Sequence, residues 1–188
     1  MSAGADAIGF VFDAGSPRHV SVEQASAIAS AVAPFVTIVG LFVDADSERV
    51  RDVLKRVPLH LLQFHGSENP DQCRLHQLPY IKAVRMQPGI DLPTQARRYQ
   101  DAAALLLDAY VPAIAGGTGH TFDWTRIPRD LGRRVILAGG LTPANVMEAV
   151  RAVRPYAVDV SSGVEQSKGI KDAAKIDAFV RAVAQAAA

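Results

Sequence analysis

The 188-residue sequence has one cysteine and almost no excess charge. Cys73 has no partner for a disulfide within the chain, which fits a reducing cytoplasm. The net charge of +1 and the lack of any Lys/Arg tract argue against a nucleic-acid or acidic-membrane partner. No signal peptide is recognisable, and the longest apolar run, at residues 35–43, is too short to span a bilayer. These absences predict a soluble, cytoplasmic protein.

Short apolar runs alternate with amphipathic segments along the whole chain. Seven strands are predicted, at residues 7–12, 35–43, 59–64, 80–84, 103–107, 135–138 and 156–160. The helices between and after them are predicted at residues 21–33, 46–57, from Asn69-Pro70 onward, 92–99, 124–131, 142–153 and 173–186. Continuously apolar strands are typical of a parallel sheet covered by helices. Without any linker or composition shift, the alternation predicts one α/β domain over residues 1–188, either a doubly wound sheet or a closed barrel.

Glycine and serine clusters follow three successive strands near the C-terminus. In (β/α)8 barrels, the last strand–helix loops bind phosphate through backbone N–H groups, whereas a dinucleotide-binding sheet carries its glycines after the first strand. The GxxxxGK[ST] phosphate loop is absent. Each glycine alone could serve only its turn. Their shared placement predicts a TIM barrel with a phosphate cradle made of Gly117, Thr118, Gly119, Gly139, Gly140, Ser161, Ser162 and Gly163.

Motifs at these strand ends, in order along the chain, carry a family resemblance. They are Gly9-Phe10-Val11-Phe12, Ser16-Pro17-Arg18, Gln63-Phe64-His65-Gly66, Leu107-Asp108, Gly116-Gly117-Thr118-Gly119, Phe122-Asp123-Trp124, Ala138-Gly139-Gly140-Leu141 and Asp159-Val160-Ser161-Ser162-Gly163-Val164-Glu165. The combination resembles phosphoribosylanthranilate isomerase. The resemblance implies an Amadori rearrangement of N-(5-phosphoribosyl)anthranilate to 1-(2-carboxyphenylamino)-1-deoxyribulose 5-phosphate in tryptophan biosynthesis, with no metal or organic cofactor.

The same resemblance implies roles for single residues. Asp108 is expected to be the general acid that opens the ribose ring, although any aspartate after a strand can simply cap a turn. Arg18 is expected to orient the anthranilate and the intermediates, since a guanidinium suits a carboxylate. Gln63 and His65 are expected to contact substrate, with a purely structural histidine as the alternative.

One departure from the family pattern concerns the start of the chain. The family opens with a strand ending in Lys-Ile-Cys-Gly, whose cysteine is the general base, and the resemblance implies that about twenty such residues, strand one and most of helix one, are missing here. Cys73 lies in helical sequence and does not replace that cysteine. The seven strands would then be the second to the eighth of a barrel incomplete at its N-terminus. We expect an in-frame stretch of that kind in the DNA upstream of Met1, and a full-length form that is a monomer or small homo-oligomer.

The missing base leaves other readings open. The chain could be a non-catalytic sugar-phosphate-binding remnant, or another sugar-phosphate barrel enzyme such as the histidine-pathway isomerase or indole-glycerol-phosphate synthase. With strand one absent, the strands at 7–12 and 156–160 would each have an unpaired side, which predicts poor solubility or association through those edges. Of the remaining polar residues, Asp159 is expected to pin a loop, and Lys168 and Lys171 to be solvated.

Overall fold

The structure is a computed structural model that describes residues 3–109 and 121–187. It divides into two compact units, Met1–Ala83 and Val84–Ala188. The seven main strands are parallel neighbours in chain order, β1 to β7. Strand β4 (Tyr80–Arg85) runs across the boundary between the units. The predicted α/β alternation of seven strands is therefore confirmed.

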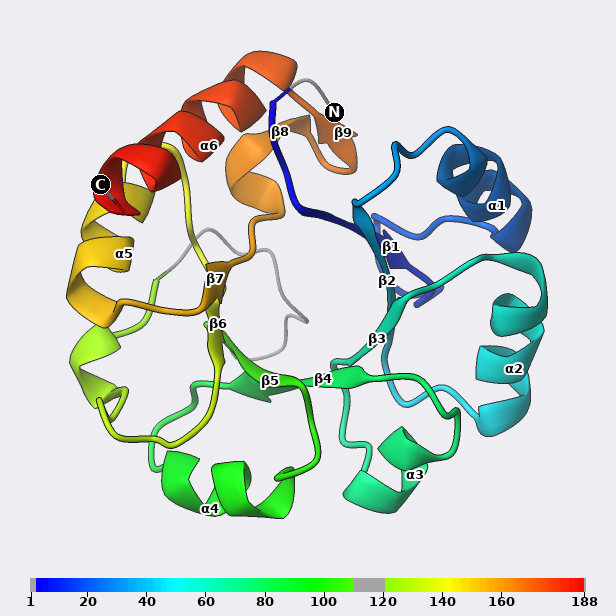
Figure 1. Ribbon diagram of the computed structural model, residues 1–188, viewed down its shortest axis with the longest axis horizontal. Coiled ribbons are helices and arrows are strands. Elements are labelled where there is room, and N and C mark those ends of the chain that lie inside the picture. Colours follow the sequence, from blue (N-terminus) through cyan, green and yellow to red (C-terminus); the bar gives the residue numbers. More distant parts are fainter. Residues whose placement is uncertain (1–2, 110–120, 188) are drawn as a thin grey trace. The chain divides into compact units, whose positions relative to one another are not determined.

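The first unit holds three complete strand–helix pairs and the beginning of β4. Its elements before β4 are β1 (Ala7–Val11), α1 (Val22–Ser30), β2 (Thr37–Phe42), α2 (Ser47–Arg56), β3 (Leu61–Phe64) and α3 (Pro70–Arg74). The register pairs Ala7 with Thr37, Val39 with Leu61 and Leu62 with Tyr80. Figure 1 shows α1, α2 and α3 on the same face of these strands. That arrangement explains why the strands read as continuous apolar runs.

Local signals set the helix starts in this unit. The Ser21 side chain accepts the Gln24 N–H at 3.2 Å while the Gln24 side chain accepts the Ser21 N–H at 2.9 Å, a reciprocal capping box. Asp46 likewise caps α2, because its side chain accepts the Arg49 N–H at 2.7 Å. Aromatic rings also join neighbouring strands: Phe12 stacks on Phe42 with 5.3 Å between ring centroids.

The second unit continues the alternation after β4. Its elements are α4 (Leu92–Arg98), β5 (Ala104–Asp108), the 3-10 turn η1 (Trp124–Arg126), β6 (Val135–Leu137), α5 (Val146–Val153), β7 (Ala157–Val158), the 3-10 turn η2 (Ser162–Val164), β8 (Glu165–Ser167), β9 (Ile170–Lys171) and α6 (Ala173–Ala187). A buried cluster that includes Leu137, Leu141, Val146 and Phe179 joins β6, α5 and α6. Phe122 and Trp124 pack against the same cluster.

Several predicted elements of the second unit are shorter in the structure than expected. The helix expected at 124–131 is only the η1 turn, because Ile127 precedes Pro128 and is held extended at φ −88°, ψ 112°. The helix expected from residue 142 begins at Val146, because the Asn145 side chain accepts the Thr142 N–H at 2.8 Å and donates to the Gly140 carbonyl at 3.0 Å, which fixes a turn there. The last barrel strand is only β7, instead of residues 156–160.

A small hairpin was not predicted. Strands β8 and β9 form a two-stranded antiparallel sheet next to the C-terminal helix α6. They are too short and too polar to show the alternation that marks a strand in sequence. In the described ranges, no helix combines the length and apolarity needed to cross a membrane.

Candidate active site

In the second unit, the carboxyl ends of β5, β6 and β7 bring the predicted acid and two predicted phosphate loops to one edge. Asp108 is the last residue of β5, and only 7 % of its surface is exposed. Gly139-Gly140 closely follows β6, and Ser161 follows β7. Because the three strands are parallel neighbours, these residues follow the same ends of the strands and lie at one edge of the sheet.

The turn after β6 packs directly on the acid. Gly139 and Gly140 have φ angles of +79° and +65°, the left-handed region that side chains disfavour. A β-carbon added at Gly139 would lie 2.8 Å from Oδ1 of Asp108 and would overlap the backbone nitrogen of Ala109. Only glycine therefore allows this turn to lie against the Asp108 carboxyl.

The loop after β7 packs on the turn after β6. A β-carbon added at Gly163 would overlap the carbonyl oxygen of Leu141, so the two backbones are in contact there. The Ser161 carbonyl accepts a hydrogen bond from Nζ of Lys171 at 2.9 Å, and the same ammonium lies 3.1 Å from Oε1 of the buried Glu165. Lys171 thus contacts this loop while its side chain stays 43 % exposed, in line with the expectation that it is solvated.

These loops present polar groups that can bind an anion. Within the described part of the chain, the N–H groups of Gly139 and Gly140 and the hydroxyls of Ser161 and Ser162 donate no hydrogen bond. Backbone N–H groups gathered in a concave turn favour phosphate. The remaining predicted cradle residues, Gly117, Thr118 and Gly119, lie outside the described residues. Asp159, next to β7, is exposed, and its N–H donates to the Leu137 carbonyl at 2.9 Å.

In the first unit, Arg18 lies in the loop that follows β1. This loop turns back on the strand, since Val20 N–H donates to the Val11 carbonyl at 3.0 Å and His19 forms a bridge with Val11. Arg18 itself is half-buried, and its N–H donates to Oγ of Ser16 at 3.2 Å. The loop therefore holds the arginine at the carboxyl end of β1.

Gln63 and His65 lie at the carboxyl end of β3. Nε2 of Gln63 lies 3.1 Å from Nδ1 of His65, and the His65 N–H donates to the Phe42 carbonyl at 2.8 Å. An amide nitrogen can only donate, so with this orientation Nδ1 accepts and a neutral imidazole carries its proton on Nε2. Gln63 is buried, whereas His65 is half-buried, so the imidazole is the more accessible of the two.

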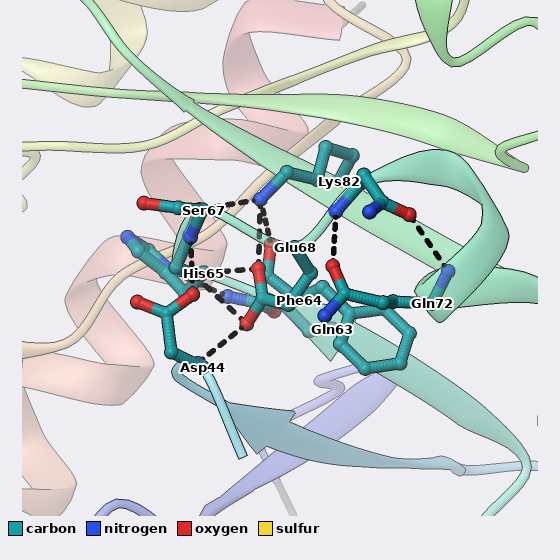
Figure 2. Close-up of polar contacts among 10 residues, drawn as sticks. Asp44, Gln63, Phe64, His65, Ser67, Glu68, Gln72 and Lys82 are labelled. Carbon is teal, nitrogen blue, oxygen red and sulfur yellow. Dashed lines mark hydrogen bonds and ion pairs between the residues drawn. The ribbon is translucent and has the colours of Figure 1, made fainter. Parts of the chain in front are cut away.

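Sequence reasoning missed a buried ion pair beneath His65. Nζ of Lys82, on β4, lies 2.9 Å from Oε2 of Glu68, and these side chains are only 4 % and 3 % exposed. Figure 2 shows the pair together with Asp44 and the end of β3. The signal in the sequence is a single lysine inside the apolar strand of residues 80–84, because lysine is almost never fully buried unless it is paired.

The second unit also has a cavity away from these loops. Its lining includes Trp124, Tyr156 and the residue before β6, Arg134, and so it lies at the amino ends of β6 and β7. The four arginines that line it are Arg129, Arg133, Arg134 and Arg154. In barrel folds this end serves stability, whereas function lies at the carboxyl end of the strands. No group of three or more metal-ligating side chains occurs among the residues at positions 3–109 and 121–187.

Comparison with known proteins gives one consistent family. The family model described as N-(5'-phosphoribosyl)anthranilate (PRA) isomerase matches residues 1–182. The N-(5'-phosphoribosyl)anthranilate isomerase of Pseudomonas putida strain F1 is 59 % identical over 184 residues, which cover 98 % of this chain and 89 % of the relative.

Solved structures agree with this assignment. The phosphoribosyl anthranilate isomerase of Thermotoga maritima superposes with a TM-score of 0.89 at 41 % identity, covering 98 % of this chain and 90 % of that one. Another phosphoribosyl anthranilate isomerase structure is a complex with reduced 1-(o-carboxyphenylamino)-1-deoxyribulose 5-phosphate. It superposes with a TM-score of 0.86 at 39 % identity, covering 98 % of this chain and 90 % of that one. The TIM-barrel-like α/β fold predicted from sequence is thereby confirmed. The chain belongs to the N-(5'-phosphoribosyl)anthranilate isomerase family.

Proposed function

We propose that this chain isomerises N-(5'-phosphoribosyl)anthranilate to 1-(2-carboxyphenylamino)-1-deoxyribulose 5-phosphate, a step of tryptophan biosynthesis. The family match over residues 1–182 supports this activity. It also disfavours the other sugar-phosphate barrel enzymes considered above. The structural observation that carries the proposal is the contact between the glycine turn at Gly139 and the carboxyl of Asp108. This contact supports the proposal that Asp108 acts as a proton donor beside a backbone that binds phosphate.

Asp108 is assigned as the general acid of the ring-opening step. Its proton goes to the ribose ring oxygen, the bond from C1′ to that oxygen breaks, and the anthranilate nitrogen forms a Schiff base with C1′. Loss of the C2′ proton to solvent water then gives an enolamine, and protonation at C1′ with loss of the C2′ hydroxyl proton converts it to the ketone. No metal or organic cofactor enters this scheme, in which Asp108 supplies the first proton and solvent takes up the C2′ proton.

The other assignments follow the chemistry of the substrate. The phosphate is assigned to Gly139, Gly140, Ser161, Ser162 and Gly163 in the second unit, and also to the cradle residues outside the described ranges. Arg18 is assigned to the anthranilate carboxylate, which a guanidinium can bind with two hydrogen bonds. Gln63 and His65 are assigned to substrate contact, with Nε2 of His65 as the donor, because Nδ1 faces Gln63 at 3.1 Å.

A second candidate function has one observation in its favour. The only cysteine, Cys73, is fully buried in α3, so it does not supply a thiolate base for the C2′ proton. We assign no base among the 188 residues of this sequence. A polypeptide that binds the sugar phosphate without turning it over is therefore the alternative.

Binding and turnover separate these functions. Calorimetric titration of the 188-residue chain with reduced 1-(o-carboxyphenylamino)-1-deoxyribulose 5-phosphate is expected to show saturable binding. The dephosphorylated compound should bind at least about tenfold more weakly, because each lost charge-assisted hydrogen bond costs about 1.5–3 kcal/mol. In the isomerase assay, Asp108→Asn should lower kcat about 10²–10⁴-fold relative to the parent and leave affinity for the reduced product nearly unchanged.

Each result has a distinct meaning. Binding together with turnover that depends on Asp108 supports the isomerase. Binding by a parent chain that shows no turnover supports the sugar-phosphate binder. A parent chain that binds neither compound contradicts both proposals.

A further inference from the structure

The ammonium of Lys82 holds both sides of the residue expected to touch substrate. Nζ donates to the Phe64 carbonyl at 3.2 Å and to the Gly66 carbonyl at 2.6 Å, and these are the residues before and after His65. Nζ also donates to Oε2 of Glu68 at 2.9 Å. In Figure 2 the ammonium of Lys82 lies over this turn, on the side of Glu68.

These contacts use all of the donors that the lysine has. An ammonium has three N–H groups, and three acceptors lie within hydrogen-bond distance of Nζ. The side chain is also only 4 % exposed. Lys82 is therefore placed to hold the backbone on either side of His65 and has no proton left to offer a substrate.

Glu68 locks the same turn from its other side. Its carboxylate accepts the Asp44 N–H at 2.8 Å and the Gly66 N–H at 2.9 Å. Asp44 in turn accepts the Ser67 N–H at 2.6 Å. A β-carbon at Gly66 would lie 2.5 Å from Cγ of Asp44, so the turn has no room to shift toward β2.

A purely stabilising role does not account for this pair. Replacing a buried ion pair with apolar residues of similar volume is often neutral or stabilising, because desolvating two charges offsets their attraction. An apolar pair, however, could not hold the carbonyls of Phe64 and Gly66. What the charges add is a fixed conformation at His65.

We propose that the buried Lys82–Glu68 pair consists of positioning residues that fix His65 for contact with the substrate, an inference that rests on the proposed function. The pair acts through the backbone of residues 64–66, and neither side chain touches the substrate. The imidazole is then presented with its Nε2 proton in one orientation, fixed by the contact between Gln63 and His65 Nδ1. Without the pair, the turn samples several conformations and the histidine contact is lost.

A mutant cycle tests this role. The pair-replaced variant Lys82→Met/Glu68→Leu removes both charges together, so that neither is left buried alone. Its affinity for reduced 1-(o-carboxyphenylamino)-1-deoxyribulose 5-phosphate is measured with and without His65→Ala, and its melting is followed by calorimetry. We expect cooperative melting near the parent temperature and binding about 10–100-fold weaker, because losing one hydrogen bond to a charged ligand weakens binding by about this factor. Adding His65→Ala should then change little, and KM for the substrate should rise more than kcat falls.

A control and a second variant keep the outcome interpretable. Arg56→Met breaks the exposed pair with Glu23 in the same unit and should leave binding unchanged. If the pair-replaced variant does not fold, Glu68→Gln, which keeps an acceptor for Lys82, is put through the same cycle with His65→Ala.

Two results would overturn the inference. One is a pair-replaced variant that binds the reduced product as tightly as the parent. The other is a loss of affinity in that variant that multiplies with the separate loss caused by His65→Ala, which would show that the two changes act independently. In both cases the parent still binds and the proposed function stands. A parent that does not bind the reduced product rejects the proposed function, and this inference with it.

Discussion

The two units order the edges that are proposed to bind substrate in different ways. In the first unit, buried charged side chains, Lys82 and Glu68 with Asp44 beside them, order the turn at the end of β3. In the second unit, close contacts of glycine backbone order the loops: Gly139 lies against Asp108, and Gly163 lies against Leu141. One βα architecture thus supports both a side-chain network and a backbone cradle.

The difference matches what each edge is proposed to bind. Phosphate is a compact anion that backbone N–H groups satisfy, and glycine allows the backbone to approach it closely. The anthranilate carboxylate is proposed to bind Arg18, and the substrate is proposed to contact His65. Such side chains keep one orientation only where the backbone that carries them is fixed. Mutations should therefore destabilise the two edges by different mechanisms. At the first edge they leave a buried charge without its partner, and at the second they force a side chain to overlap the backbone.

The largest expected effect follows from breaking the buried pair on one side only. Lys82→Met leaves the Glu68 carboxylate buried without its partner, which typically costs about 3–5 kcal/mol of unfolding free energy. Arg56→Met is the matched control, because its pair with Glu23 has side chains 45 % and 68 % exposed, and its unfolding curve should nearly overlay that of the parent. Urea unfolding followed by circular dichroism measures both. Equal losses for the two variants would contradict the account of the first edge.

An intermediate effect is expected at the glycine contact of the second edge. Gly163→Ala pushes a methyl group into the Leu141 carbonyl, and overpacking of this kind typically costs about 1–3 kcal/mol. Gly9→Ala is the control, since a β-carbon there meets no atom within 4 Å, and it should be neutral or stabilising by up to about 1 kcal/mol. Thermal unfolding compares the two. If both variants melted alike, the backbone contact between the two loops would be refuted.

The smallest effect concerns acid stability at the exposed pair. Hydrogen bonding to its own backbone N–H, and then to Arg56, lowers the pKa of Glu23 from 4.5 to about 2. A carboxyl whose pKa is lowered by folding adds stability that is complete above about pH 4.5 and is lost as the pH falls toward 2. NMR titration of Glu23 should give the low pKa in the parent and a higher one in Arg56→Met. An unchanged pKa in that variant would show that the pair has no effect on this carboxyl.

Much of the second edge was predictable because its signals are local. Two glycines directly after an apolar strand predict a turn with positive φ. Parallel topology brings the carboxyl ends of neighbouring strands to one edge. The order of strands followed from the same alternation. Asp108 was visible because it ends the run Leu105-Leu106-Leu107.

The first edge was less readable because its contacts are distant in sequence. The carboxylate of Glu68 accepts the Asp44 N–H from 24 positions away, and Lys82 reaches Glu68 across 14 positions, so the pairing depends on the register of β2, β3 and β4. The end of α5 was predicted correctly. Its start was wrong, because the Asn145 side chain forms a turn that the Thr142-Pro143 sequence does not reveal. The hairpin β8–β9 was missed for lack of any apolar alternation.

The most direct test asks which backbone amides of the second unit respond to a phosphate ligand. We propose titrating the ¹⁵N-labelled 188-residue chain with reduced 1-(o-carboxyphenylamino)-1-deoxyribulose 5-phosphate and following amide shifts by NMR. The account predicts the largest changes at Gly139, Gly140, Ser162 and Gly163. Changes confined to the arginine-lined cavity around Arg134 and Arg154, at the amino ends of β6 and β7, would contradict it.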